Sequence, residues 1–134
     1  MSCVFCEHSS RGAEKVILSN DVCRVILVAD KYYPGYIQII SNSHVKELTD
    51  LSSDNALIVF NTILHMEKTI RKIFNPDKVN IASLGNVVPH LHWHIIPRYF
   101  NDRHFPNPVW GEILNPEYLP DSHLHRCMTT LIGI

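Results

Sequence analysis

The chain has 134 residues, with 12 Lys and Arg against 13 Asp and Glu, and 46% of its residues are apolar. This length predicts one domain that buries a single core. The net charge of −1 argues against nucleic acid as a partner, because a surface that neutralises many phosphates needs an excess of basic residues. No stretch has the roughly 18 uninterrupted apolar residues of a membrane helix, and the first residues carry no signal segment. We therefore predict a cytoplasmic protein without membrane contact.

The first predicted elements are two strands. Residues 22–28 are rich in β-branched side chains, and a second strand-like run follows at 36–40. The turn residues Tyr33, Pro34 and Gly35 lie between them. We predict an antiparallel hairpin with a long loop.

A long helix comes next. Residues 52–54 offer candidate N-caps. Behind them, apolar side chains recur with the spacing of one helix face, at Val59, Ile63, Met66, Ile70 and Ile73. Asn75 and Pro76 end this pattern, so we predict a helix over 54–74.

Two further strands are predicted, at 78–84 and 90–96. Antiparallel strands with helices to one side describe an α+β domain. After Pro97 four more prolines, at 106, 108, 116 and 120, indicate irregular chain. His123, His125 and Cys127 resemble a second metal group, but their spacing is short and nothing nearby completes a site. We interpret this part as an unstructured or dimer-packing tail.

Histidine is the most informative residue type, because nine are present and three alternate in one predicted strand. His90, His92 and His94 share one face, since residues i, i+2 and i+4 of a strand point the same way. The outer two are ~13 Å apart, whereas zinc binds nitrogen at ~2.0–2.1 Å. Three histidines in this row cannot easily hold one ion, so at least one has another role.

Two interpretations of the histidine row are open. The side chains could face solvent or form internal hydrogen bonds, as a lone histidine usually does. An imidazole can also act as a nucleophile, a general acid or a clamp for an anion. A row of three suits a reaction at a phosphate, with His92 at the centre.

The run from His90 to Ile96 resembles the His-x-His-x-His signature of the histidine triad (HIT) superfamily of nucleotide hydrolases and transferases. It looks like the short bacterial members described as diadenosine polyphosphate hydrolase-like. The similarity extends to further segments: Tyr33-Pro34-Gly35, residues 41–44, 80–89 and 105–110, and Pro97-Arg98. It covers roughly residues 3–111. We therefore predict a HIT-like domain over 1–111 and a C-terminal tail over 112–134 that wraps the surface or packs against a second subunit.

The resemblance implies an α+β fold with a five-stranded antiparallel sheet, one long and one short helix, and a two-fold homodimer whose sheets join. It also implies attack on the α-phosphate of a nucleotide conjugate, such as a dinucleoside polyphosphate or a nucleoside phosphoramidate. His92 would be the nucleophile, and the carbonyl group of His90 would hold its other ring nitrogen. His94 would contact the phosphate or protonate the leaving group.

Substrate-binding residues are implied in the same way. Asn80, Gly85 and Asn86 would form a phosphate-holding turn, and Asp30 lies where relatives place an acid on the ribose hydroxyls. Several branches of the family have a further histidine directly after the Pro-Gly turn, and this chain has Tyr36 there. The proton network around the nucleophile would therefore differ.

Cys3 and Cys6 could be metal ligands, a redox pair or idle thiols. In zinc-bearing branches of the family, a short Cys-x-x-Cys motif, a histidine after the hairpin and the first triad histidine bind one structural zinc ion. The equivalents here are Cys3, Cys6, His44 and His90. Two thiolates and two imidazoles form a closed tetrahedral site.

The same residues could serve two other functions. In a metal-dependent hydrolase, His92 and His94 would bind a catalytic ion together with His104 or His44, whereas the resemblance implies that no catalytic metal is required. In a non-catalytic nucleotide-binding module, the histidines would only hold a phosphate.

Overall fold

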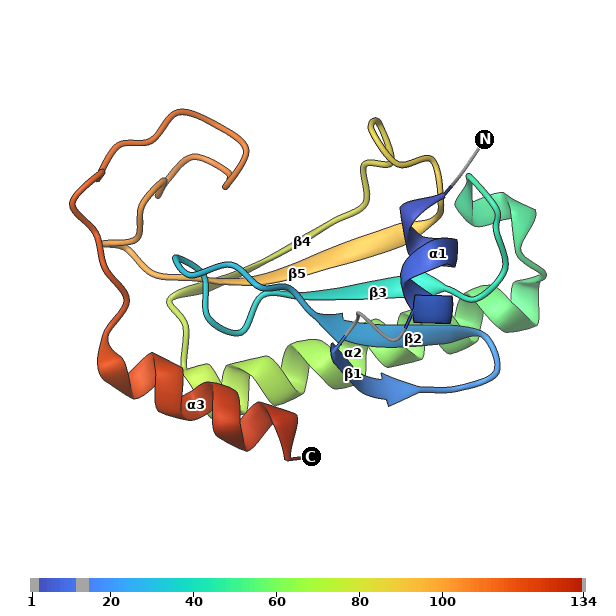
Figure 1. Cartoon of the computed structure of the whole chain (residues 1–134), viewed down its shortest axis with the longest axis horizontal. Helices are drawn as coiled ribbons and strands as arrows, with labels where there is room; N and C mark the ends of the chain where they lie inside the picture. Colours follow the sequence, from blue (N-terminus) through green and yellow to red (C-terminus); the bar gives the residue numbers. More distant parts are fainter. Residues whose placement is uncertain (1–2, 12–14, 134) are drawn as a thin grey trace.

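The computed structural model describes residues 3–11 and 15–133. Five strands form one antiparallel sheet in the order β1-β2-β3-β5-β4 (Figure 1). They are β1 (Lys15–Ser19), β2 (Cys23–Leu27), β3 (Ile37–Ser41), β4 (Lys78–Ala82) and β5 (His92–Arg98). The helices are α1 (Val4–Arg11), α2 (Ser53–Phe74) and α3 (Ser122–Ile132), with a short 3-10 helix at Leu48–Asp50. The predicted α+β class and the five-stranded sheet are confirmed.

The sheet separates two environments. Val25, Ile39 and Trp93 point to the face that α2 covers and form the main core with Val59 and Met66 of that helix. The alternate residues of the same strands point to the other face, where Phe5 of α1 packs against Ile26 and Ile40. The strand period predicted this division, with Trp93 in the core and His92 and His94 on the opposite face, which we call the histidine face.

Helix α2 agrees with the prediction to within one residue. The Oγ atom of Ser52 accepts a hydrogen bond from the backbone N–H of Asn55, which is an N-cap contact. The helix ends at Asn75, whose φ of 46° is left-handed. Directly before this end, the ring of Phe74 fits against Gly35, where a Cβ atom would lie 2.7 Å from the ring. The end of α2 therefore supports the turn between β2 and β3.

The prediction of an irregular C-terminal tail was wrong for residues 122–132, which form α3. Leu124, Cys127 and Leu131 share one helix face and are buried in the main core beside α2. Because α3 packs on its own chain, the four prolines mark only the loop before it. The division at residue 111 and any contact of this segment with a second subunit stay predictions.

Strand β5 begins two residues later than predicted, at His92, so His90 precedes the strand. The backbone near His90 is still paired, because Leu91 donates to the carbonyl oxygen of Val45 and accepts from the N–H of Ser41. Among the helices of the described residues, none is both long and apolar enough to cross a membrane.

Candidate active site

His92 and His94 lie side by side on β5, with ring centroids 4.9 Å apart, and both are buried. The Nδ1 atom of His92 lies 2.6 Å from the backbone carbonyl oxygen of His90. A carbonyl oxygen only accepts, so Nδ1 carries the proton and Nε2 keeps a free lone pair. The predicted contact is present, and it gives His92 the tautomer that a nucleophile requires.

His94 has a different partner. Its Nδ1 atom lies 2.6 Å from the hydroxyl oxygen of Tyr36, which directly precedes β3. Burial and, to a smaller extent, His92 lower the pKa of His94 to about 4. Burial and the carboxylate of Asp30 raise the pKa of Tyr36 to about 12. At neutral pH both groups are uncharged, and the proton between them stays on the hydroxyl group.

The segment between β4 and β5 carries the predicted phosphate-binding residues. Gly85 has a φ of 69°, a left-handed conformation that favours glycine. Asn86 is exposed beside it. The Oγ atom of Ser83 donates to the carbonyl oxygen of His92 at 2.6 Å, which fixes this loop to the nucleophile strand. Asn80 lies on β4 and pairs with Ile96. Phosphate binding by these residues stays a prediction.

Asp30 lies in the loop after β2, where its Oδ1 atom accepts the backbone N–H of Tyr32. Its negative charge contributes to the raised pKa of Tyr36 and partly offsets the lowering of the pKa of His104. Ribose binding by Asp30 stays a prediction.

A buried network around Arg98 was not predicted from the sequence. This side chain donates to both carboxylate oxygens of Asp102, at 2.8 and 3.1 Å, and to the amide oxygen of Asn80 at 2.7 Å. Burial alone would raise the pKa of Asp102, but hydrogen bonds from Arg98 and the backbone lower it. Tyr33 contacts both Asp102 and His104 through its hydroxyl group. Arg98 falls on the same strand period as His92 and His94, which was the available signal.

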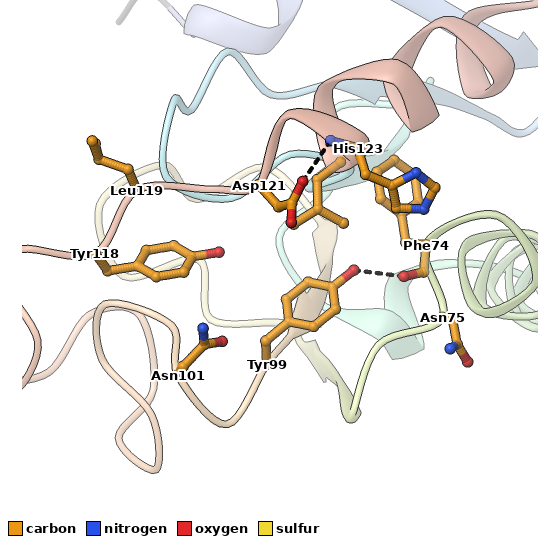
Figure 2. A pocket seen from close by; sticks show the side chains of 9 residues that line it. Phe74, Asn75, Tyr99, Asn101, Tyr118, Leu119, Asp121 and His123 are labelled. Atoms are coloured by element: carbon orange, nitrogen blue, oxygen red, sulfur yellow. Dashed lines mark hydrogen bonds between the residues drawn. The ribbon is translucent and has the colours of Figure 1, made fainter.

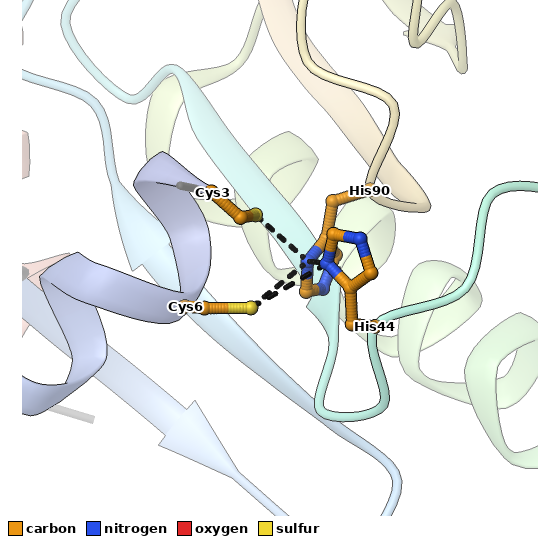
Figure 3. Close-up of side chains that lie close together, drawn as sticks. All are labelled: Cys3, Cys6, His44 and His90. Carbon is orange, nitrogen blue, oxygen red and sulfur yellow. Dashed lines mark hydrogen bonds between the residues drawn. The ribbon is translucent and has the colours of Figure 1, made fainter. Parts of the chain in front are cut away.

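The predicted metal ligands converge at the other end of the histidine face. Single ligand atoms of Cys3, Cys6, His44 and His90 all lie within 4.8 Å of one another (Figure 3). The sulfur atom of Cys3 is 3.3 Å from Nδ1 of His90, that of Cys6 is 3.5 Å from Nδ1 of His44, and the two Nδ1 atoms are 3.1 Å apart.

This donor set fits zinc. Tetrahedral bonds of ~2.3 Å to sulfur and ~2.0–2.1 Å to nitrogen separate ligand atoms by about 3.3–3.8 Å, close to the spacing found here. The Nε2 atom of His90 lies 2.7 Å from the carbonyl oxygen of Ser41, to which it donates. The proton is therefore on Nε2, and Nδ1 is free to bind a metal.

The sequence profile of the HIT domain matches residues 10–101. This range includes all three histidines of the triad, His90, His92 and His94. The chain belongs to the HIT family. A histidine triad protein of Bradyrhizobium japonicum has a similar structure, with a TM-score of 0.73, 29% identity and 92% of each chain covered.

Two curated relatives carry names that describe an activity. A bis(5'-nucleosyl)-tetraphosphatase (asymmetrical) of Schizosaccharomyces pombe is 31% identical over 60% of this chain and 47% of its own length. An AP-4-A phosphorylase of Mycobacterium tuberculosis is 23% identical over 80% of this chain and 58% of its own length. The HIT chain thus spans about half the length of these two relatives.

A separate cavity of about 470 Å³ lies near the C-terminal end of α2 and the start of α3 (Figure 2). It is lined by Phe74, Asn75, Tyr99, Asn101, Tyr118, Leu119, Asp121, His123 and Leu124. Tyr99 donates its hydroxyl hydrogen to the carbonyl oxygen of Phe74 at 2.7 Å. No predicted site residue of this HIT chain lines the cavity, so the cavity is distinct from the triad.

Proposed function

We propose that this HIT protein is a nucleotide hydrolase or nucleotidyl transferase that cleaves at the α-phosphate of a nucleotide conjugate. The observation that carries the proposal is the 2.6 Å contact between Nδ1 of His92 and the carbonyl oxygen of His90, which leaves Nε2 as an unprotonated nucleophile. The names of the tetraphosphatase and the phosphorylase support dinucleoside polyphosphates as the substrate class.

The reaction has two steps. The Nε2 lone pair of His92 attacks the α-phosphorus, and the bond from phosphorus to the leaving group breaks, with its electron pair departing on that group. Water or another acceptor then attacks the nucleotidyl-histidine, and the P–N bond returns its electron pair to Nε2. The proton of the attacking water passes to solvent. The His90 carbonyl stabilises the positive charge that the imidazole carries in the intermediate.

His94 and the loop before β5 would bind the phosphate oxygens. With Nδ1 accepting from Tyr36, His94 directs a Nε2–H donor at the substrate. Gly85 and Asn86 would supply further donors, and Asn80, whose amide oxygen is held by Arg98, keeps its NH2 group for the ligand. Donors fixed before substrate arrives stabilise the developing charge without reorganisation.

We infer that Cys3, Cys6, His44 and His90 hold a structural zinc ion. When bound, zinc would connect α1 to the residues that precede β5. His90 also supplies the carbonyl oxygen that orients His92, so the metal centre and the nucleophile share one residue. Among the described residues, the cluster of candidate metal ligands excludes His92 and His94. This argues against the alternative in which these two histidines bind a catalytic ion.

We also infer a homodimer. The edge strand β4 exposes Ile81, and helix α2 exposes Leu57, Phe60 and Leu64 at helical spacing. A second copy would cover this apolar surface and the unpaired edge of β4. Light scattering should give the mass of a dimer, and Leu64→Glu should give a monomer. A cytoplasmic location stays a prediction.

The test of the function is turnover by His92→Asn on dinucleoside polyphosphates and nucleoside phosphoramidates. We expect a loss of at least about a thousandfold in kcat with little change in mononucleotide binding. His65→Asn is the matched control, because His65 is exposed on α2. Full activity of His92→Asn, together with an unchanged fold, would contradict the proposal. Binding by the wild type without turnover of any substrate would instead favour a nucleotide-binding module.

A further inference from the structure

Tyr36 is in direct contact with the triad histidine that would hold the phosphate. Its hydroxyl group is 2.6 Å from Nδ1 of His94, and the amide nitrogen of Gln38 is 3.4 Å from the same atom. Tyr36 and His94 are each more than nine-tenths buried. His94 is the hydrogen-bond partner of the Tyr36 hydroxyl within the described residues. If that hydroxyl accepted from Nδ1, its own hydrogen would be left buried without a partner.

The contact therefore fixes the direction of the hydrogen bond. Tyr36 donates, Nδ1 of His94 accepts, and the ring proton of His94 is on Nε2. The surroundings of His94 also disfavour its protonated form. Burial and, to a smaller extent, the neighbouring imidazole of His92 lower the pKa of His94, and no carboxylate of the described residues offsets this effect. His94 is consequently a neutral hydrogen-bond donor, and its second proton is absent at neutral pH.

A neutral His94 limits which bonds can break. A phosphate or polyphosphate leaving group departs as a weakly basic anion, so it takes the electron pair of the P–O bond and needs no proton. An amine bound through a P–N bond would have to depart as a strongly basic amide anion unless its nitrogen is protonated first. That proton must come from a general acid in the site. Neither a neutral imidazole nor a buried tyrosine hydroxyl is a strong enough acid.

We propose that Tyr36 makes this site prefer nucleotide conjugates whose leaving group is a weakly basic oxygen anion over conjugates with amines. The proposal rests on the proposed function, because it assumes that His92 attacks the α-phosphate. It deepens that function by separating dinucleoside polyphosphates from nucleoside phosphoramidates. Tyr36 acts as a positioning residue through His94, and it does not itself transfer a proton.

The experiment compares kcat/KM for diadenosine tetraphosphate and adenosine 5'-phosphoramidate. The wild type should prefer the polyphosphate by at least about a hundredfold. Tyr36→His offers a second imidazole in place of the phenol, so a proton can be shared with His94. In this variant, the ratio of kcat/KM for the polyphosphate to kcat/KM for the phosphoramidate should fall at least about tenfold. Tyr32→His is the control, because Tyr32 lies in the same loop and contacts Lys31 and Arg103 instead of His94. It should keep the wild-type ratio.

A second measurement needs only the wild type, so it stands even if Tyr36→His does not fold. In a series of aryl esters of AMP, the logarithm of kcat/KM should fall steeply as the phenol becomes more basic, since no acid assists its departure. A slope near zero, or a phosphoramidate rate within tenfold of the polyphosphate rate, would overturn the proposal. An unchanged ratio in folded Tyr36→His would also overturn it.

These outcomes are distinct from failure of the proposed function. The 4-nitrophenyl ester of AMP has a leaving group that needs no proton, so the wild type should cleave it and His92→Asn should not. If His92→Asn cleaves this ester at the wild-type rate, His92 is not the nucleophile. This conclusion does not depend on the preference between polyphosphate and amine conjugates.

Discussion

Arg98 and Asp102 form a buried ion pair in which the guanidinium group contacts both carboxylate oxygens, at 2.8 and 3.1 Å. Their side chains are 2% and 0% exposed. Arg98 also donates to Asn80 on β4 and to the carbonyl oxygen of Asn107. One side chain thus connects two strands of the sheet with the loop that follows the triad.

Loss of this pair should destabilise the protein strongly. Arg98→Met leaves Asp102 buried without its charge partner, which should lower the free energy of unfolding by about 3–5 kcal/mol. Urea denaturation measures this change. Arg71→Met is the control, because Arg71 pairs with Glu67 at 3.8 Å on the exposed side of α2. It should cost less than about 1 kcal/mol. Equal stability of the two variants would contradict the role of Arg98.

The depressed pKa of His94 predicts how stability depends on pH. A buried neutral histidine binds its proton more weakly in the folded state than in the unfolded state, where the pKa is about 6.5. Stability is therefore retained above pH 6.5 and is lost as the pH falls toward 4. The loss from this one group is about 3 kcal/mol, because each tenfold difference in proton affinity between the two states corresponds to about 1.4 kcal/mol.

Comparison of the wild type with His94→Asn isolates this contribution. Unfolding free energies measured from pH 7.5 to pH 4 should fall more steeply for the wild type than for the variant. Parallel curves would show that His94 does not carry a depressed pKa.

The cysteine and histidine cluster predicts zinc binding. We expect one zinc ion per chain in protein purified from zinc-containing medium, and loss of the ion in Cys6→Ser. Removal of zinc by a chelator should also lower the thermal midpoint, because Cys3 and Cys6 anchor α1 to His44 and His90. Elemental analysis and a thermal scan measure both effects.

The control for zinc is Cys23→Ser, since Cys23 lies in the core with its sulfur 3.7 Å from the hydroxyl oxygen of Thr62. It should retain the full zinc content. Equal zinc content in Cys6→Ser and the wild type would exclude the proposed ligand set.

The elements with regular periods were predictable from the sequence. The apolar spacing from Val59 to Ile70 located α2, and the alternation around His92 placed this residue and Trp93 on opposite faces of β5. Helix α3 was missed because Leu124, Cys127 and Leu131 show only a short helical period behind a proline-rich loop.

Long-range contacts were not accessible to the same reasoning. The contact of Tyr33 with His104 spans 71 positions, and that of Cys3 with His90 spans 87. Local periods contain no information on such pairs. The contact of Cys3 with His90 was predicted from the resemblance to the HIT family alone. The contact of Tyr36 with His94 was not predicted, because it depends on the pairing of β3 with β5.

The most direct test of the account is detection of the covalent intermediate on His92. After rapid quenching during turnover of a dinucleoside polyphosphate, intact mass spectrometry at neutral pH should show a chain heavier by one nucleotidyl group. Peptide mapping should place that group on His92, and His94→Asn should still form it while His92→Asn does not. Turnover at full rate with no adduct on any histidine, in a quench fast enough to trap a single turnover, would contradict the central claim.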